Sequence, residues 1–176
     1  METLKIHRRA ARKRALQCVF ALSFHKFEDK EQVRRFFLAL PQEDQSEESP
    51  QDLAAHGSDP GRGRKPGVEM TPEDLDFAQR LALGTHHWLG EIDPIVRRFS
   101  KHWKIERIAR AELSILRLGV YEMLHESDIP LRVSINEAVE LSKEFADEQS
   151  FPFVNGILDA VAKAVSHGEF GISKQF

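Results

Sequence analysis

The sequence predicts an all-α protein, a single domain of about seven helices around one core. Most segments repeat apolar residues at the helical spacing i, i+3, i+4 and i+7. Helix-start signals, in which a capping residue precedes a proline or an acid, recur along the chain. No segment shows a convincing strand alternation or an internal repeat. With 176 residues, 41% of them hydrophobic, the chain is long enough for one core and too short for two comfortable domains.

The first helix is predicted over residues 7–27, with an apolar C-terminal half and a basic N-terminal half. Residues 1–14 hold six cations against Glu2 alone, a charge of +5 in a chain whose net charge is −3. Like charges four residues apart on a helix cost a few tenths of a kcal/mol, so they indicate a polyanionic partner such as successive phosphates. A charged tail that is simply solvated is the alternative, and the charge pattern alone does not distinguish it from a phosphate-binding cluster. The six cations are Lys5, Arg8, Arg9, Arg12, Lys13 and Arg14.

A second helix is predicted over residues 29–40, because apolar residues keep the helical spacing up to Pro41. At about 41–70 the composition shifts to acids, Gly and Pro, which predicts a flexible insertion. Thr71 followed by Pro72 then predicts a helix start, with an N-cap and a proline in the first turn.

Asp93 and Pro94 repeat this start signal and predict another short helix. Residues 105–125 are apolar on two sides, which is typical of a helix at the centre of a fold. Pro130 marks a break before the next helix, since its ring cannot continue one.

The last two helices are predicted from their ends. Ser134 and Glu137 have the spacing of a capping box, so one helix is expected to start there. The final helix is expected to end at Gly168, a suitable residue for the left-handed position after a helix. Inside it, Gly156 predicts close approach of a neighbouring helix, and Asn155 is expected to be half-buried with its amide bonded to a loop.

Composition argues against several functions. The lone Cys18 cannot form an internal disulfide, and no segment reaches the length of a membrane span, so a cytoplasmic protein is expected. The adjacent His86 and His87 lack further ligands at helical spacing, which argues against a metal site. No phosphate-binding loop or nucleophile motif is found. We therefore expect a binding protein without a catalytic site, cofactor or metal.

Four segments of the chain together carry a family resemblance: RRAARKRALQCVF at 8–20, ILRLGVYEML at 115–124, DIPLRVSINEAVELSK at 128–143 and FVNGILD at 153–159. They resemble the NusB family of bacterial transcription antitermination proteins. The resemblance runs in order from about residue 7 to about residue 166, and implies two packed helical bundles in one domain over residues 1–170. The insertion at about 41–70 is longer than the usual connection of the family, and residues 168–176 would form a C-terminal tail.

The resemblance implies binding of boxA-type single-stranded RNA together with ribosomal protein NusE. It further implies a role in loading an antitermination complex on RNA polymerase during ribosomal RNA synthesis. A ribosomal RNA processing or assembly module is the alternative, because NusB-like domains also occur fused to an RNA methyltransferase. The sequence leaves open whether the isolated protein forms a homodimer.

The family's site residues carry over onto matching positions of this chain. Phe20 and Glu112 match positions on the surface that faces RNA or NusE, and Phe20 stands where the family often has Tyr. Lys13 replaces an acid common in the family, which makes the motif more basic. The positions expected to contact RNA are Arg8, Arg9 and Arg12 with the neighbouring Lys5, Lys13 and Arg14, and, nearer the core, Arg117 and Phe153.

Overall fold

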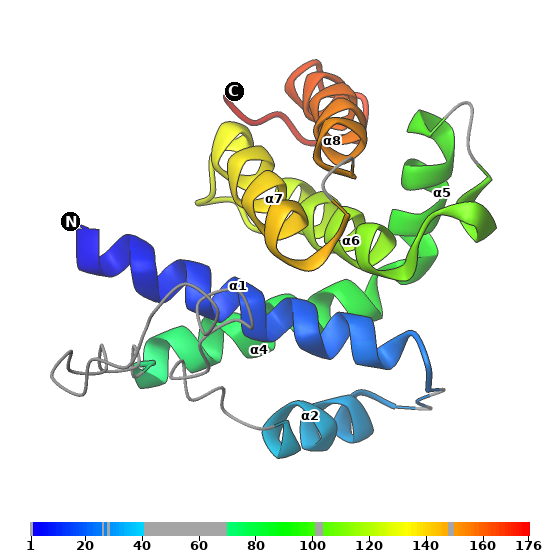
Figure 1. Cartoon of the computed structure of the whole chain (residues 1–176). Coiled ribbons are helices and arrows are strands. Elements are labelled where there is room, and N and C mark those ends of the chain that lie inside the picture. Colours follow the sequence, from blue (N-terminus) through cyan, green and yellow to red (C-terminus); the bar gives the residue numbers. More distant parts are fainter. Residues whose placement is uncertain (1, 26, 28, 41–69, 101–103, 148–149) are drawn as a thin grey trace, which may run out of the picture.

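The computed structural model describes residues 2–25, 27, 29–40, 70–100, 104–147 and 150–176, with side chains from residue 7 onward. Within these ranges the chain is all-α, with seven α-helices, one short 3-10 helix and no strand (Figure 1). The predicted insertion at 41–70 lies almost entirely outside the described residues. The elements are α1 (Glu2–Leu22), α2 (Lys30–Ala39), α4 (Pro72–His87), α5 (Leu89–Phe99), η1 (Ile105–Arg107), α6 (Arg110–His125), α7 (Leu131–Phe145) and α8 (Ser150–Ser166).

The helices form two packed bundles, as predicted. Helices α1, α2 and α4 make the first, and α5 to α8 make the second (Figure 1). Helix α6 is central, because it contacts α1 and α4 as well as α5, α7 and α8. Its Gly119 lets α8 approach closely: a Cβ there would lie 3.0 Å from Leu158 Cδ1. The prediction that residues 105–125 hold the central helix is confirmed, although the α-helix itself begins only at Arg110.

Helix α1 connects the two bundles, since it packs on α2 and α4 on one side and on α6 on the other. Small side chains permit this, and Ala11, Ala15 and Cys18 are completely buried. Burial raises the pKa of the Cys18 thiol to about 12, so this cysteine behaves as a small apolar residue.

Two predicted helix starts are confirmed by their hydrogen bonds. Asp29 caps α2 by accepting from the Gln32 N–H at 2.8 Å. Thr71 caps α4 in a complete capping box: its hydroxyl oxygen accepts from the Asp74 N–H, and its own N–H donates to the Asp74 carboxylate. These starts could be predicted because each cap depends only on neighbouring residues.

Two predicted boundaries are wrong. The first helix ends at Leu22 and not at residue 27, since the chain turns at Ser23, whose hydroxyl donates to the Phe20 carbonyl. Helix α5 begins at Leu89, which places Pro94 inside it rather than at its start. Pro94 cannot donate to Gly90, four residues earlier, but Gly90 is exposed and its carbonyl can be hydrated.

The predicted capping box at Ser134 is also wrong. Helix α7 already begins at Leu131, directly after the extended Pro130. Ser134 is buried inside the helix, and its hydroxyl donates to Glu122 of α6 at 3.1 Å. Glu137 accepts from Arg9 of α1. Both side chains therefore form tertiary contacts, which take the place of the local cap.

The end of α8 is confirmed, but its interior differs from the prediction. Gly168 has φ +76°, and the N–H groups of Gly168 and Glu169 donate back to Val165 and Ala164, which is a Schellman motif. No neighbouring heavy atom lies within 4 Å of a Cβ built on Gly156, and Asn155 is exposed. Close approach of another helix therefore does not explain Gly156.

The segment after Gly168 folds back onto the second bundle. Phe170 and Ile172 pack against the core. Lys174 Nζ donates to the carbonyls of Glu122 and Glu126 at 3.1 and 2.7 Å, which satisfies the last turn of α6. None of the described helices is long and apolar enough to cross a membrane.

Candidate nucleic-acid interface

The basic residues of α1 do not form one exposed patch. Arg9 and Lys13, four residues apart, point toward α7 and pair with its acids. Arg9 donates to both carboxylate oxygens of Glu137, at 3.0 and 3.2 Å, and Lys13 Nζ lies 2.6 Å from Glu144 Oε1. The Arg9 side chain keeps 44% of its surface exposed, so it can still meet a ligand from solvent.

Arg12 and Arg14 are buried, with 4% and 5% exposure. Arg12 makes a two-pronged contact with Glu122, with N···O distances of 2.7 and 3.1 Å. Arg14 Nη2 donates to the carbonyls of Phe37 and Leu40 at 3.2 and 3.1 Å. The structure thus places both guanidinium groups inside the protein, where they join helices.

Of the two remaining basic residues of α1, one is half-buried against an aromatic ring and the other has no described side chain. Arg8 is half-buried, with its guanidinium 4.2 Å from the centre of the Phe77 ring, a cation–π geometry. The Lys5 side chain lies outside the described residues. Arg8, Arg9 and Lys13 are therefore the described cations of α1 that reach the surface.

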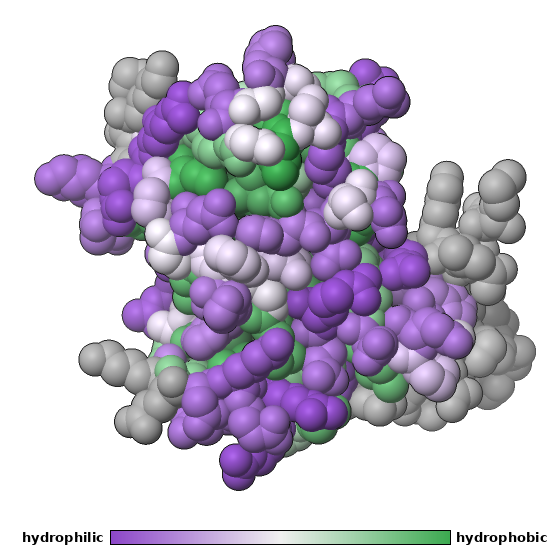
Figure 2. All heavy atoms as spheres, turned by 180° about the vertical axis from the view of Figure 1, so that it is seen from behind, coloured by the Kyte–Doolittle hydropathy of each residue, from purple (hydrophilic) through white to green (hydrophobic). Residues whose placement is uncertain are grey.

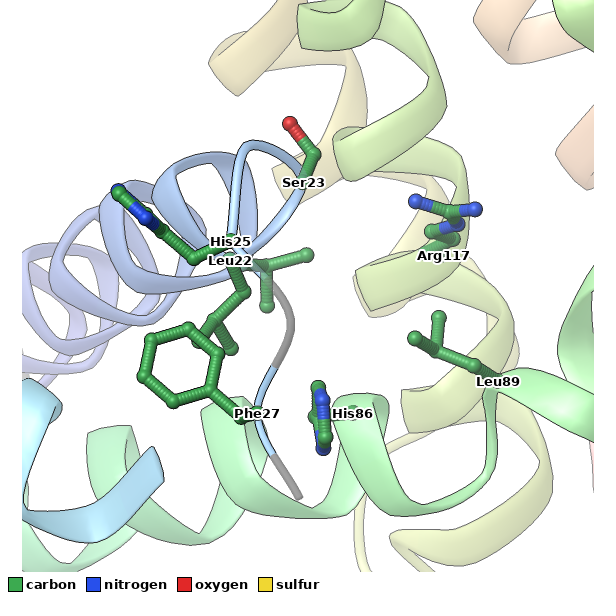
Figure 3. Close-up of a pocket in the computed structure, with 8 residues that line it drawn as sticks. Leu22, Ser23, His25, Phe27, His86, Leu89 and Arg117 are labelled. Carbon is green, nitrogen blue, oxygen red and sulfur yellow. The ribbon is translucent and has the colours of Figure 1, made fainter. Parts of the chain in front are cut away.

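Arg117 lines a groove between the ends of α1 and α4 and the start of α5. The groove has a volume of about 460 Å³, and Figure 3 shows Leu89 beside Arg117 on one wall, with Phe27 and His86 opposite. Arg117 is held by Asp93 through two hydrogen bonds of 2.8 Å. Burial lowers the pKa of His86, and the neighbouring His87 adds to the effect.

Phe20 and Glu112 differ in what they offer to a partner. Phe20 is 38% exposed and meets Phe24 edge to face, with 5.2 Å between ring centres. Glu112 accepts from the Ala109 N–H at the start of α6 and from the buried Ser150 hydroxyl at the start of α8. Glu112 therefore fixes the position of two helix starts. Phe153 is half-buried and packs against the core rather than standing exposed.

Sequence reasoning missed four surface residues near these positions. The Arg110 guanidinium lies 4.2 Å from the centre of the exposed Phe24 ring, and Lys143 Nζ lies 5.8 Å from that of the exposed Phe151. Spacing could have indicated Phe24, since it follows Phe20 by four positions, whereas the separation of two between Phe151 and Phe153 puts their side chains on different faces of α8 and gives no such signal. Such cation–aromatic pairs suit the stacking of unpaired bases.

Figure 2 shows one face on which hydrophilic residues predominate, with hydrophobic residues visible in patches between them. Over the described part of the chain, no three His, Cys, Asp or Glu side chains come together as metal ligands would. Lys143 first, and then Arg9, hold the pKa of the Glu140 carboxyl below its usual range, so the Glu140 carboxylate is charged at neutral pH.

Comparisons with known proteins agree with this architecture. The model of the NusB family matches residues 64–163. The transcription antitermination protein NusB of Oleidesulfovibrio alaskensis is 39% identical over 161 residues, which cover 92% of this chain and 90% of that protein. The protein of the same name from Nitratidesulfovibrio vulgaris strain DP4 is 40% identical over 162 residues, 92% of each chain.

Two solved structures are also similar. NusB of T. maritima superposes with a TM-score of 0.66 at 29% identity, over 89% of this chain and 90% of that one. A crystal structure of the antitermination factors NusB and NusE in complex with dsRNA gives a TM-score of 0.60 at 25% identity, over 90% of this chain and 97% of that one. A family match over more than half of the sequence and relatives of similar length lead to one conclusion: the chain belongs to the NusB family.

Proposed function

We propose that this protein is a non-catalytic, RNA-binding antitermination factor that acts in the cytoplasm. With ribosomal protein NusE, it would hold boxA-type single-stranded RNA and help to load the antitermination complex on RNA polymerase at ribosomal RNA operons. The observation that carries the proposal is the near-full-length similarity to proteins named transcription antitermination protein NusB. The similar structure of NusB with NusE and dsRNA adds support.

The described geometry narrows the proposed RNA contacts. Arg8, Arg9 and Lys13 reach the surface of α1 and would contact phosphates, while the buried Arg12 and Arg14 would support the fold. Phe20 is exposed enough to meet a base or NusE. Glu112 would act by positioning the starts of α6 and α8 at the NusE-facing surface. Arg117 and Phe153 would complete the RNA contacts from the second bundle.

The test is binding of the whole protein, with and without NusE, to a boxA-like RNA and to a scrambled RNA over a salt series. We expect the boxA-like RNA to bind more tightly, and NusE to increase that affinity. Each phosphate contact to single-stranded RNA should lower log affinity by about 0.7 per decade of salt. Equal binding of both RNAs, unaffected by NusE, would rule the proposal out.

Two matched variants test whether the RNA phosphates contact α1. Arg9→Gln should weaken binding of both RNAs and reduce the salt slope. Arg35→Gln removes the same charge from an exposed position on α2, which lies on the side of the first bundle away from α7 (Figure 1), and should leave binding unchanged. Equal loss in both variants would indicate an effect of net charge rather than a contact at α1.

A further inference from the structure

We infer that the carboxylates of α7 occupy Lys13 and Arg9 of α1 and compete with RNA phosphates for them, so that they set the affinity for RNA. This inference rests on the proposed function, because it assumes that α1 meets the phosphate backbone. The acids are Glu137, Glu140 and Glu144.

The three acids are placed as a row facing α1. They stand at i, i+3 and i+7, so they share one face of α7. Arg9 lies between two of them, with a two-pronged contact to Glu137 and an Nη1···Oε2 distance of 4.0 Å to Glu140. One turn further along α1, Lys13 meets Glu144 at 2.6 Å. Each cation of this face is therefore already engaged by a carboxylate.

Glu140 and Glu144 can release their partners most easily because they lie at the surface. Their side chains are 43% and 45% exposed, whereas that of Glu137 is 18% exposed. Ion pairs in contact with water contribute little to folding, since both charges remain hydrated when they separate. The Arg12–Glu122 pair is different: both side chains are at least 95% buried, so neither can leave its partner for an RNA.

A phosphodiester carries the same single negative charge, on two anionic oxygens, as the carboxylate that it would replace. Anionic oxygens of either group accept short hydrogen bonds from guanidinium and ammonium donors. An RNA that contacts Lys13 must therefore displace Glu144, and part of the phosphate attraction is offset by the lost pair. The exposed acids of α7 thus act as a built-in competitor.

The test is a double-mutant cycle with Lys13→Gln and Glu144→Gln, read out as affinity for the boxA-like RNA. Glu144→Gln should raise affinity about two- to five-fold, the size expected for release of one exposed ion pair. It should also steepen the salt slope by about 0.7, one additional phosphate contact. Lys13→Gln should weaken binding modestly in the wild-type background and more strongly in the Glu144→Gln background, where it cancels the gain.

Coupling within the cycle separates direct competition from a general effect of charge. A long-range effect would make the two substitutions additive, and additivity would overturn the inference. Glu169→Gln, which removes an exposed acid paired with Arg98 at the end of α8, is the matched control and should not reproduce the gain. Weaker binding by Glu144→Gln, in a variant with unchanged helix content, would show that the acid positions α1 and would also overturn the inference.

The outcomes distinguish the inference from the proposed function. If wild-type protein binds the boxA-like RNA and the cycle is additive, only the competition is wrong. If none of the four proteins of the cycle binds either RNA, the proposed function falls, and the inference falls with it.

Discussion

Burial separates Arg12 and Arg14 from the other described cations of their motif. Both Arg12 and Glu122 are withdrawn from water, and the Ser134 hydroxyl supplies a further hydrogen bond to the carboxylate. A charge left alone in such a place costs several kcal/mol, whereas an exposed pair contributes little. Residues of one basic run therefore have different roles, which depend on the depth at which each side chain ends.

We predict that Glu122→Gln lowers the free energy of unfolding by about 3 kcal/mol or more, because it leaves the Arg12 charge buried without a counter-charge. Glu169→Gln, in the exposed pair with Arg98, should cost less than about 1 kcal/mol. Urea unfolding with linear extrapolation measures both. A similar small cost for the two variants would contradict the structural role of Arg12.

The hydrogen bonds of Asp74 predict a pH dependence. Burial pushes its pKa upward, but hydrogen bonds from Thr71 and from His7 outweigh this and lower it below its usual value. The charged form is therefore favoured in the folded state, so its stabilising contribution is present above about pH 4 and lost as the pH falls through the lower folded pKa.

We accordingly expect the difference in melting temperature between wild type and Asp74→Asn to be largest near pH 6 and to shrink toward pH 3. Thermal unfolding followed by circular dichroism at several pH values measures it. Asp76→Asn, an exposed position on the same helix, is the control. A difference that stays constant with pH would show that the carboxylate of Asp74 does not contribute through its charge.

At the scale of single residues, the sequence could predict that basic residues cluster on α1, but not which of their side chains are buried and which are exposed. The positions of the cations on α1 follow from helical spacing. The burial of Arg12 does not, because its partner Glu122 stands 110 residues later. Local signals carry no information about such contacts.

Two glycines inside helices give the clearest contrast at the scale of an element. A Cβ on Gly84 of α4 would lie 2.2 Å from Tyr121 Cζ of α6, so this glycine is required by packing. A Cβ on Gly156 of α8 would meet nothing within 4 Å. One sequence feature thus has two different causes.

We predict opposite signs for the same substitution at these positions. Gly84→Ala should destabilise the protein by about 1–3 kcal/mol, because the buried Tyr121 ring must move. Gly156→Ala should stabilise it by about 0.5–1 kcal/mol, because alanine loses less backbone freedom in a helix. Urea unfolding measures the free energy of unfolding of both variants. A lower free energy for Gly156→Ala would show that a side chain at this position of α8 does meet a neighbour.

The starts of α2 and α4 were predictable because their caps are local, whereas the start of α7 was not, because its expected capping residues bond to other helices. Asp29 and Thr71 cap their helices through residues three positions away. Ser134 and Glu137 have equally good spacing, but each finds a partner on another helix. Competition between local and long-range hydrogen bonds explains why α7 begins at Leu131 and not at the predicted Ser134.

At the scale of the molecule, α1 joins the two bundles. It packs on α4 and on α6, and its ion pairs reach α7. We therefore expect the slowest-exchanging amides of α4 and α8 to report the same free energy of opening in native-state hydrogen exchange. Amides of α2, which packs at the edge of the first bundle, should exchange sooner. A lower plateau for α4 than for α8 would mean that the bundles unfold separately.

Both ends of the connection between α2 and α4 are held by α1. Arg14 binds the carbonyls at the end of α2, and His7 binds Asp74 in the first turn of α4, with a ring nitrogen to carboxylate distance of 3.0 Å. Seven residues of helix separate these two clamps, a span of about 10 Å. The end of α2 and the start of α4 are thus both held by the same helix, and their positions do not depend on the length of chain between them. We therefore expect that a foreign peptide, such as an affinity tag or a fluorescent reporter, can be inserted between α2 and α4 without altering either helix.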